Sequence, residues 1–153
     1  MSAENPNVLA EETHASWFWG AILLLPLIGM IRVAAIAPVA GVRLALALSS
    51  LILVGAAIMA LTGFRYTFTP AGLEIRTLGY RLRSIAPGEI REYAIADWNI
   101  ARGYGIRGLG NRRAYVWGNS GVRIKTTNGE VFLGHSDPEK IIHDLDLIKQ
   151  FAP

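Results

Sequence analysis

The stretch LALALSSLILVGAAIMALTGF, residues 44–64, carries no charged side chain at any of its 21 positions. As an α-helix it would extend about 31 Å, close to the roughly 30 Å thickness of the hydrocarbon core of a bilayer. Its polar side chains are all hydroxyls, which can bond to carbonyl groups of the preceding helical turn. We therefore predict a transmembrane helix over residues 44–64 and disfavour the alternative, a buried helix of a soluble protein.

A second apolar stretch precedes this helix. Residues 15–31 are uncharged, and we predict a helix over residues 15–36 with Arg32 near its far end, where the long side chain can reach the membrane interface. Pro26 is expected to kink it. A cleaved signal peptide should begin with a positive segment, but residues 1–16 hold three acidic groups and no Lys or Arg. We therefore expect an uncleaved helix, and the two helices together form a transmembrane hairpin over residues 15–64.

The hairpin predicts which residues lie at each membrane interface. Aromatic side chains favour this zone, and the predicted anchors on the side of the termini are Trp17, Trp19, Phe64 and Tyr66, with Arg32 and Arg43 on the opposite side. The bias of Lys and Arg toward the side of the termini predicts that both termini are cytoplasmic. Small residues also recur on one face of the second helix, namely Ala45, Ser49, Ala56 and Ala60. They predict close packing against the first helix, with homo-oligomerisation as the alternative.

Composition limits the remaining possibilities. Only 18% of residues are charged and 52% are apolar, and the pI is about 9.5. The basic excess lies in residues 65–136, with a net charge of +6, whereas the first 16 residues carry −3. The chain has no cysteine, which excludes a disulfide scaffold. The basic stripe is short and follows a membrane anchor, so no nucleic-acid partner is predicted.

The pattern changes at residue 65 to short alternating segments separated by turn residues. We predict seven strands over residues 65–134, with one long loop at residues 97–112. Ser136-Asp137-Pro138-Glu139 fits a capping box and precedes an amphipathic helix whose apolar stripe is Ile141, Ile142, Leu145 and Ile148. The predicted organisation is an acidic N-terminal tail (residues 1–14), the hairpin (15–64) and a β domain (65–153).

This order of elements resembles a known family. The stretches RYTFTPAGLEIRTLGYRLRSI and YGIRGLGNRRAYVWGNSGVRIKTTNGEVFLGHSDPEKI, together with the preceding hairpin, resemble the bacterial pleckstrin-homology-like membrane proteins. The resemblance implies a membrane-anchored α+β protein in which a seven-stranded antiparallel β-barrel or sandwich is followed by a C-terminal helix. It also implies residence in the bacterial inner membrane. The first hairpin loop, residues 69–72, lacks the cation that phosphoinositide-binding members of the larger family carry there.

The loop after residue 97 holds the best candidates for binding. Its arginines and one tyrosine could contact a partner or a lipid headgroup, because Arg with aromatic groups can bind phosphate oxygens; they are Arg102, Tyr104, Arg107, Arg112 and Arg113. The alternative is a solvated loop, or arginines paired with Asp97 and Glu92. Residues 103–108 match G-x-G-x-x-G, but a dinucleotide site needs a helix after the glycines, and here a strand is expected. The glycines are therefore expected to permit a tight backbone path, and no cofactor is predicted.

Catalysis has little support in the sequence. There is no thiol, the three histidines are scattered, and no metal-ligand cluster or nucleophile motif is present. We therefore predict a non-enzymatic, membrane-anchored module without a metal or cofactor that binds or scaffolds a membrane protein complex. The alternative is a sensor of anionic phospholipid headgroups that binds through residues 102–113. A weaker third possibility is a subunit of an enzyme or transporter whose active residues lie on its partner.

Overall fold

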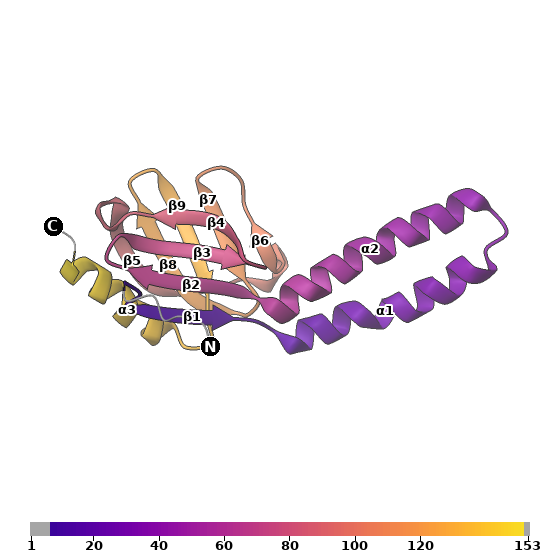
Figure 1. Ribbon diagram of the computed structural model, residues 1–153, viewed down its shortest axis with the longest axis horizontal. Coiled ribbons are helices and arrows are strands. Elements are labelled where there is room, and N and C mark those ends of the chain that lie inside the picture. Colours follow the sequence, from indigo (N-terminus) through magenta and orange to yellow (C-terminus); the bar gives the residue numbers. More distant parts are fainter. Residues whose placement is uncertain (1–6, 152–153) are drawn as a thin grey trace. The chain divides into compact units, whose positions relative to one another are not determined.

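The computed structural model of the protein describes residues 7–151, so residues 1–6 of the predicted acidic tail lie outside the described part (Figure 1). The chain divides into two compact units. One is the helical hairpin, residues 15–62, and the other is a β domain built from the preceding segment and from residue 63 onward.

The hairpin consists of α1 (Trp17–Ile36) and α2 (Ala40–Thr62), in agreement with the predicted helices at residues 15–36 and 44–64. With 20 and 23 residues, both are long and apolar enough to cross a membrane. The Ser16 hydroxyl accepts a hydrogen bond from the backbone N–H of Trp19 at the start of α1. At the other end, Arg43 Nε donates to the carbonyl of Ala37 at 2.6 Å and so satisfies a free carbonyl beyond α1.

Most side chains of the two helices are exposed, as expected of helices that face lipid rather than a protein core. Trp17 is 76% exposed and Ile36 is 80% exposed. The helices approach each other closely at Gly20, where an added Cβ would lie 2.6 Å from the Leu61 side chain. Of the predicted small-residue stripe, Ala60 is buried and Ala56 is half-buried, whereas Ala45 and Ser49 are exposed. Packing within the hairpin therefore accounts for only one end of that stripe.

The β domain contains two sheets. The first sheet has the strand order β1-β2-β3-β4, and the second sheet has the order β5-β8-β9-β7-β6. Their bounds are β1 Ala10–His14, β2 Phe64–Thr69, β3 Gly72–Thr77, β4 Tyr80–Ile85, β5 Ile90–Asp97, β6 Gly105–Arg107, β7 Arg112–Val116, β8 Ser120–Thr126 and β9 Gly129–Gly134. Two short 3-10 helices are η1 (Pro87–Glu89) and η2 (Ile100–Arg102), and the chain continues into α3 (Pro138–Phe151).

The predicted order of a helical hairpin, a β domain and a C-terminal helix is confirmed, whereas the predicted number of strands, the closed barrel and the purely antiparallel pairing are corrected. The described residues form nine strands in two sheets rather than a closed barrel, and β7 pairs with β9 in parallel. One additional strand, β1, lies in the segment taken as an acidic tail, where AEETH gives little apolar alternation. The other, β6, is only three residues long and lies inside the predicted loop at residues 97–112. Short polar strands such as these have no distinctive sequence pattern and are identified only by their pairing with neighbouring strands.

The hydrophobic core lies between the sheets and contains the largest side chains of β2. Phe64, Tyr66 and Phe68 are fully buried, which corrects the prediction that Phe64 and Tyr66 are membrane-interface anchors. The Tyr66 hydroxyl lies 3.1 Å and 3.0 Å from the carbonyl oxygens of Tyr115 and Gly134, so it bonds the first sheet to the second. Trp17, Arg32 and Arg43 are exposed on the hairpin and remain predicted anchors.

The C-terminal helix was predicted correctly, with one change at its start. The Asp137 carboxylate, rather than the Ser136 hydroxyl, accepts the hydrogen bond from the backbone N–H of Lys140 at 3.3 Å. The apolar stripe of α3 faces the core, with Ile141, Leu145 and Ile148 fully buried.

A buried polar cluster joins β1 to the region around α3. Glu12 is almost fully buried and contacts Lys140 Nζ at 2.6 Å and His135 Nε2 at 3.6 Å. The rings of His14 and His135 are 5.7 Å apart. Burial, and secondarily the neighbouring His135, lowers the pKa of His14 to about 4, so this ring is neutral at pH 7. Burial also raises the pKa of Asp144, on the adjacent turn of α3.

We predict that the β domain loses stability as the pH falls from about 6.5 to about 4. The unfolded chain takes up a proton on His14 near pH 6.5, whereas the folded chain resists it until about pH 4. The contribution of His14 is therefore fully present above pH 6.5, and about 3 kcal/mol of it is lost by pH 4. Urea unfolding of the full chain in detergent, followed by circular dichroism across this range, measures the loss.

The His14→Gln variant provides the control because it cannot titrate. Subtracting its pH profile removes the contributions of other groups, including Asp144, whose raised pKa acts in the opposite direction. Parallel pH profiles for the wild type and the variant would contradict the role assigned to His14.

Candidate functional site

A hollow on the β domain is lined by arginines. It has a volume of about 370 Å³, and its lining residues are Trp98, Arg102, Arg107, Gly108, Arg112, Arg113, Ala114, Glu130 and Phe132. We call it the arginine pocket. Four of the five predicted contact residues therefore meet at one place. The fifth, Tyr104, does not line the pocket; its hydroxyl donates to the Asn119 side chain, and its ring packs on the neighbouring apolar cluster.

One wall of the pocket is the face of the second sheet that points away from the core. The parallel pairing of β7 with β9 places Arg112 beside Glu130 and Ala114 beside Phe132. Because side chains alternate along a strand, these residues share one face, whereas Tyr115 and Val131 point into the core. The wall therefore has an apolar part formed by Ala114 and Phe132 and a charged part nearer the start of both strands.

The other wall is the segment that follows β5. Trp98 packs against Phe132, with ring centroids 5.0 Å apart, and its indole N–H donates to the carbonyl of Gly103 at 2.8 Å. This bond holds η2 and the following turn over the sheet. The guanidinium of Arg102 lies 5.8 Å from the centre of the Trp98 ring, which fixes the side chain by a cation–π contact. Trp98 is a half-buried part of this small outer cluster.

The glycines of the G-x-G-x-x-G stretch give the backbone a tight path beside the pocket. Gly103, Gly105 and Gly108 all have positive φ, with values of 73°, 92° and 84°. At Gly108 an added Cβ would lie 2.1 Å from the carbonyl oxygen of Arg112, so the backbone closes tightly at the pocket margin. The stretch continues into β6 and then β7 instead of a helix. The structure thus agrees with the predicted tight backbone path.

The pocket arginines form few contacts with the acidic residues that the structure describes. In the described part of the chain, none of Arg102, Arg107, Arg112 and Arg113 forms an ion pair. The acidic residues proposed as their partners behave differently, because Glu92 binds Lys125 at 2.9 Å and Asp97 has no ion pair among the described residues. Within the pocket, Glu130 is 3.4 Å from Arg123 on β8. Four arginines and one acidic residue, Glu130, therefore line the pocket, which carries an excess of positive charge.

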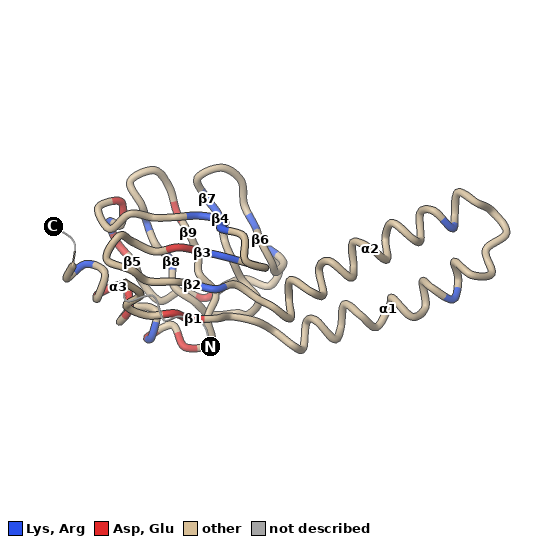
Figure 2. The backbone as a smooth tube through the Cα atoms, in the orientation of Figure 1, with Lys and Arg blue, Asp and Glu red and all other residues tan. Residues whose placement is uncertain are grey.

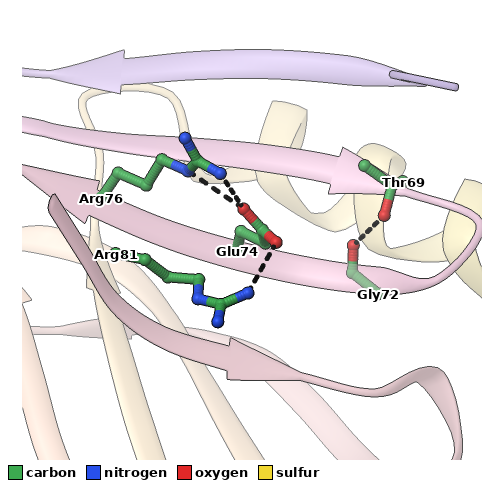
Figure 3. A network of polar contacts seen from close by, with 5 residues as sticks. All are labelled: Thr69, Gly72, Glu74, Arg76 and Arg81. Atoms are coloured by element: carbon green, nitrogen blue, oxygen red, sulfur yellow. Dashed lines mark hydrogen bonds and ion pairs between the residues drawn. The ribbon is translucent and has the colours of Figure 1, made fainter. Parts of the chain in front are cut away.

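The arginines of the first sheet provide a contrast. Arg76 and Arg81 both contact the carboxylate of Glu74, at 2.7 Å and 3.5 Å (Figure 3). The hydrogen bond from Arg76 is the main cause of the lowered pKa of Glu74. Figure 2 shows basic positions on both sheets, including β6 and β7, and acidic positions on β1 and β3. Positive charge is therefore partly neutralised on the first sheet and free at the arginine pocket.

Two further observations bear on the chemistry of this surface. Comparison with protein-family models, with curated proteins and with solved structures finds no match to this chain. Among the described residues, no group of three or more His, Cys, Asp or Glu side chains is arranged to hold a metal ion. The geometry and charge of the arginine pocket therefore carry the functional interpretation.

We predict that Gly108→Ala destabilises the β domain more than Gly110→Ala does. Both glycines have positive φ, which costs an alanine roughly 1 kcal/mol, but only at Gly108 does the added methyl group meet backbone, while Gly110 has nothing within 4 Å. We expect a loss of about 2 kcal/mol or more for Gly108→Ala and about 1 kcal/mol for Gly110→Ala. Urea unfolding in detergent measures both, and equal losses would contradict the tight closure at Gly108.

Proposed function

We propose that the protein is a non-enzymatic, membrane-anchored module that binds anionic phospholipid headgroups in the arginine pocket. The observation that carries this proposal is that four arginines line one hollow and that none of them forms an ion pair within residues 7–151. Guanidinium groups donate paired hydrogen bonds that match phosphate oxygens, and charge-assisted bonds of this kind are about twice as strong as neutral ones. A pocket of about 370 Å³ is also large enough for a phosphate and its glycerol.

The shape of the pocket supports a ligand with both charged and apolar parts. The arginines supply phosphate contacts, while Trp98 and Phe132 offer an apolar surface for the carbon skeleton of a glycerolipid. The indole N–H already bonds to Gly103, so Trp98 contributes ring surface rather than a hydrogen bond.

The connections between the two units favour a ligand at the membrane. β1 ends at His14 and α1 begins at Trp17, while α2 ends at Thr62 and β2 begins at Phe64. With two and one connecting residues, the β domain cannot diffuse away from a bilayer that holds the hairpin. Tethering raises the effective concentration of the pocket at the lipid surface, so weak intrinsic affinity is sufficient.

The fold and location belong to the same proposal. Two sheets followed by a C-terminal helix support a pleckstrin-homology-like domain, with β1 as an added N-terminal strand and a parallel β7–β9 pair as departures. The resemblance to bacterial pleckstrin-homology-like membrane proteins supports an inner-membrane location, and the bias of arginines toward the side of the termini supports a cytoplasmic β domain.

A second candidate function is the recruitment of a membrane protein complex. It is favoured by exposed apolar side chains on the segment that forms the pocket. Leu109 is 90% exposed and Ile100 is 58% exposed, and each lies two residues from an arginine, Arg107 and Arg102 respectively. Apolar groups beside Arg are typical of the centres of protein interfaces.

We predict that Arg107→Gln/Arg112→Gln weakens binding of dihexanoyl phosphatidic acid by at least about tenfold, because two charge-assisted contacts are lost. The full chain in nanodiscs of zwitterionic lipid, titrated by calorimetry, gives the affinity. Binding should also weaken as salt is raised.

The matched control is Arg76→Gln/Arg81→Gln, which removes the same charge from arginines already bound to Glu74. We expect it to change the affinity less than about twofold, since both of its arginines are paired. Equal weakening by the two double variants would indicate attraction by net charge alone and would overturn the pocket as the binding site.

The recruitment function predicts that Leu109→Asp abolishes capture of a discrete partner in crosslinked native membranes. Leu78→Asp is its control, because Leu78 is an exposed apolar residue of the β3–β4 turn. Loss of the crosslinked band in both variants, or in neither, would contradict a partner surface at Leu109.

A further inference from the structure

We infer that the β3–β4 turn enters the membrane interface and that Leu78 and Tyr80 contact lipid there, at the point where the chain leaves α2. We call residues 77–80, which read TLGY, the turn tip. The inference rests on the membrane anchoring proposed above and is independent of the arginine pocket, whose lining contains no residue of the tip.

The turn tip lies beside the residue that directly follows α2. Thr77 Oγ1 donates a hydrogen bond of 2.8 Å to the carbonyl of this residue, Gly63. Strands β2 and β3 pair with Arg65 opposite Arg76, and the same register continued by two residues sets Leu78 opposite Gly63, about 5 Å away. The headgroup layer of a bilayer is roughly 6 Å thick on each side. A membrane-spanning hairpin that brings Gly63 to this layer therefore brings the tip there as well.

The two large side chains of the tip are exposed on the β domain. Leu78 is 51% exposed and Tyr80 is 76% exposed. Tyrosine is enriched at membrane interfaces, because its ring favours apolar surroundings while its hydroxyl stays hydrated. The neighbouring leucine gains free energy wherever lipid removes its side chain from water. The tip therefore has the composition of an interfacial contact.

The charges that flank the tip are directed away from it. Arg76 and Arg81 lie opposite each other on β3 and β4, and both contact the carboxylate of Glu74 (Figure 3). Glu74 is farther from the turn than either arginine, so both guanidinium groups extend back along the sheet. The tip itself has no charged residue. Its entry into the interface therefore does not require a charged group to lose its water.

The backbone of the turn is strained at its exposed leucine. Among the described residues, Leu78 is the only non-glycine residue with a positive φ, 50°, and Gly79 follows with 81°. Two-residue hairpin turns with this backbone strongly favour Asn-Gly, and a bulky first residue is unfavourable there. Asparagine would therefore suit this position better if the turn met only water. A leucine there points to a favourable contact outside the β domain, which lipid provides.

The absence of cysteine in the chain allows a fluorophore to be placed at single positions. Leu78→Cys in the full chain is labelled with the environment-sensitive dye NBD and reconstituted in dilute form into phosphatidylcholine vesicles. This lipid has no net charge, so the result does not depend on binding of an anion in the arginine pocket. We expect blue-shifted emission, with stronger quenching by a nitroxide on the lipid headgroup than by one at acyl carbon 12.

Two further positions provide matched controls. Ala71 is exposed in the β2–β3 turn, at the other end of the same sheet and about 20 Å from the tip along β2. We expect headgroup quenching of the dye to be at least about threefold stronger at position 78 than at position 71, because of this separation. Leu51 lies in the middle of α2 and is 69% exposed. A dye at Leu51→Cys should be quenched by the nitroxide at acyl carbon 12.

The controls separate this inference from the anchoring on which it rests. Quenching at position 51 without quenching at position 78, or equal quenching at positions 71 and 78, overturns the inference while the anchoring stands. Absence of quenching at position 51 overturns the anchoring and the inference together. Blue-shifted emission at position 78 without quenching by either lipid would show burial against protein and would also overturn the inference.

Leu78→Asn tests the side chain itself. Asparagine adopts the left-handed backbone of this position, so the turn is retained while the apolar contact is removed. With the dye attached at Tyr80→Cys, we expect Leu78→Asn to weaken headgroup quenching at least about twofold, since the tip loses the apolar group that favours lipid. Unchanged quenching would overturn the contact assigned to Leu78.

Discussion

The pairing of β1 with β2 is the interaction on which the arrangement of the chain depends. These strands flank the helical hairpin in sequence, and their register places His14 opposite Phe64. The hairpin therefore begins and ends at neighbouring points of one sheet, as two antiparallel helices require. The cluster of Glu12, His135 and Lys140 reinforces this pairing from α3. Closure of a loop of about fifty residues is costly in entropy, and the ladder and cluster together offset that cost.

The arginine pocket depends on a different feature, the parallel pairing of β7 with β9. A parallel pair needs a connection that crosses over, and here β8 makes it by pairing with β9 on the other side. The start of β7 is thereby set beside the start of β9, which brings Arg112 next to Glu130. The hydrogen bond from Trp98 to Gly103 holds the segment after β5 over the same face. As a result, Arg102 and Arg112, ten residues apart in the sequence, line one hollow.

The distribution of ion pairs explains why one basic region is a candidate site and another is not. On the first sheet, Glu74 lies between Arg76 and Arg81, so the cations there stabilise the fold's surface locally. Glu130, the acidic residue that lines the pocket, lies 3.4 Å from Arg123 on β8 instead. An arginine that forms no ion pair within the protein remains able to bind an anion from outside.

The sequence alone determined the helical hairpin and the amphipathic C-terminal helix, because an uncharged run of 21 residues and a 3.6-residue apolar period are local properties. It also identified the basic loop, whose composition is read without knowledge of the fold. Only the tertiary structure decided that Phe64 and Tyr66 belong to the core, that AEETH is a strand, and that Arg102 meets Arg112 in one pocket. These properties depend on contacts with segments that are distant in the sequence. The pattern of polar and apolar residues shows how polar a segment is, but it does not show which other segment packs against it.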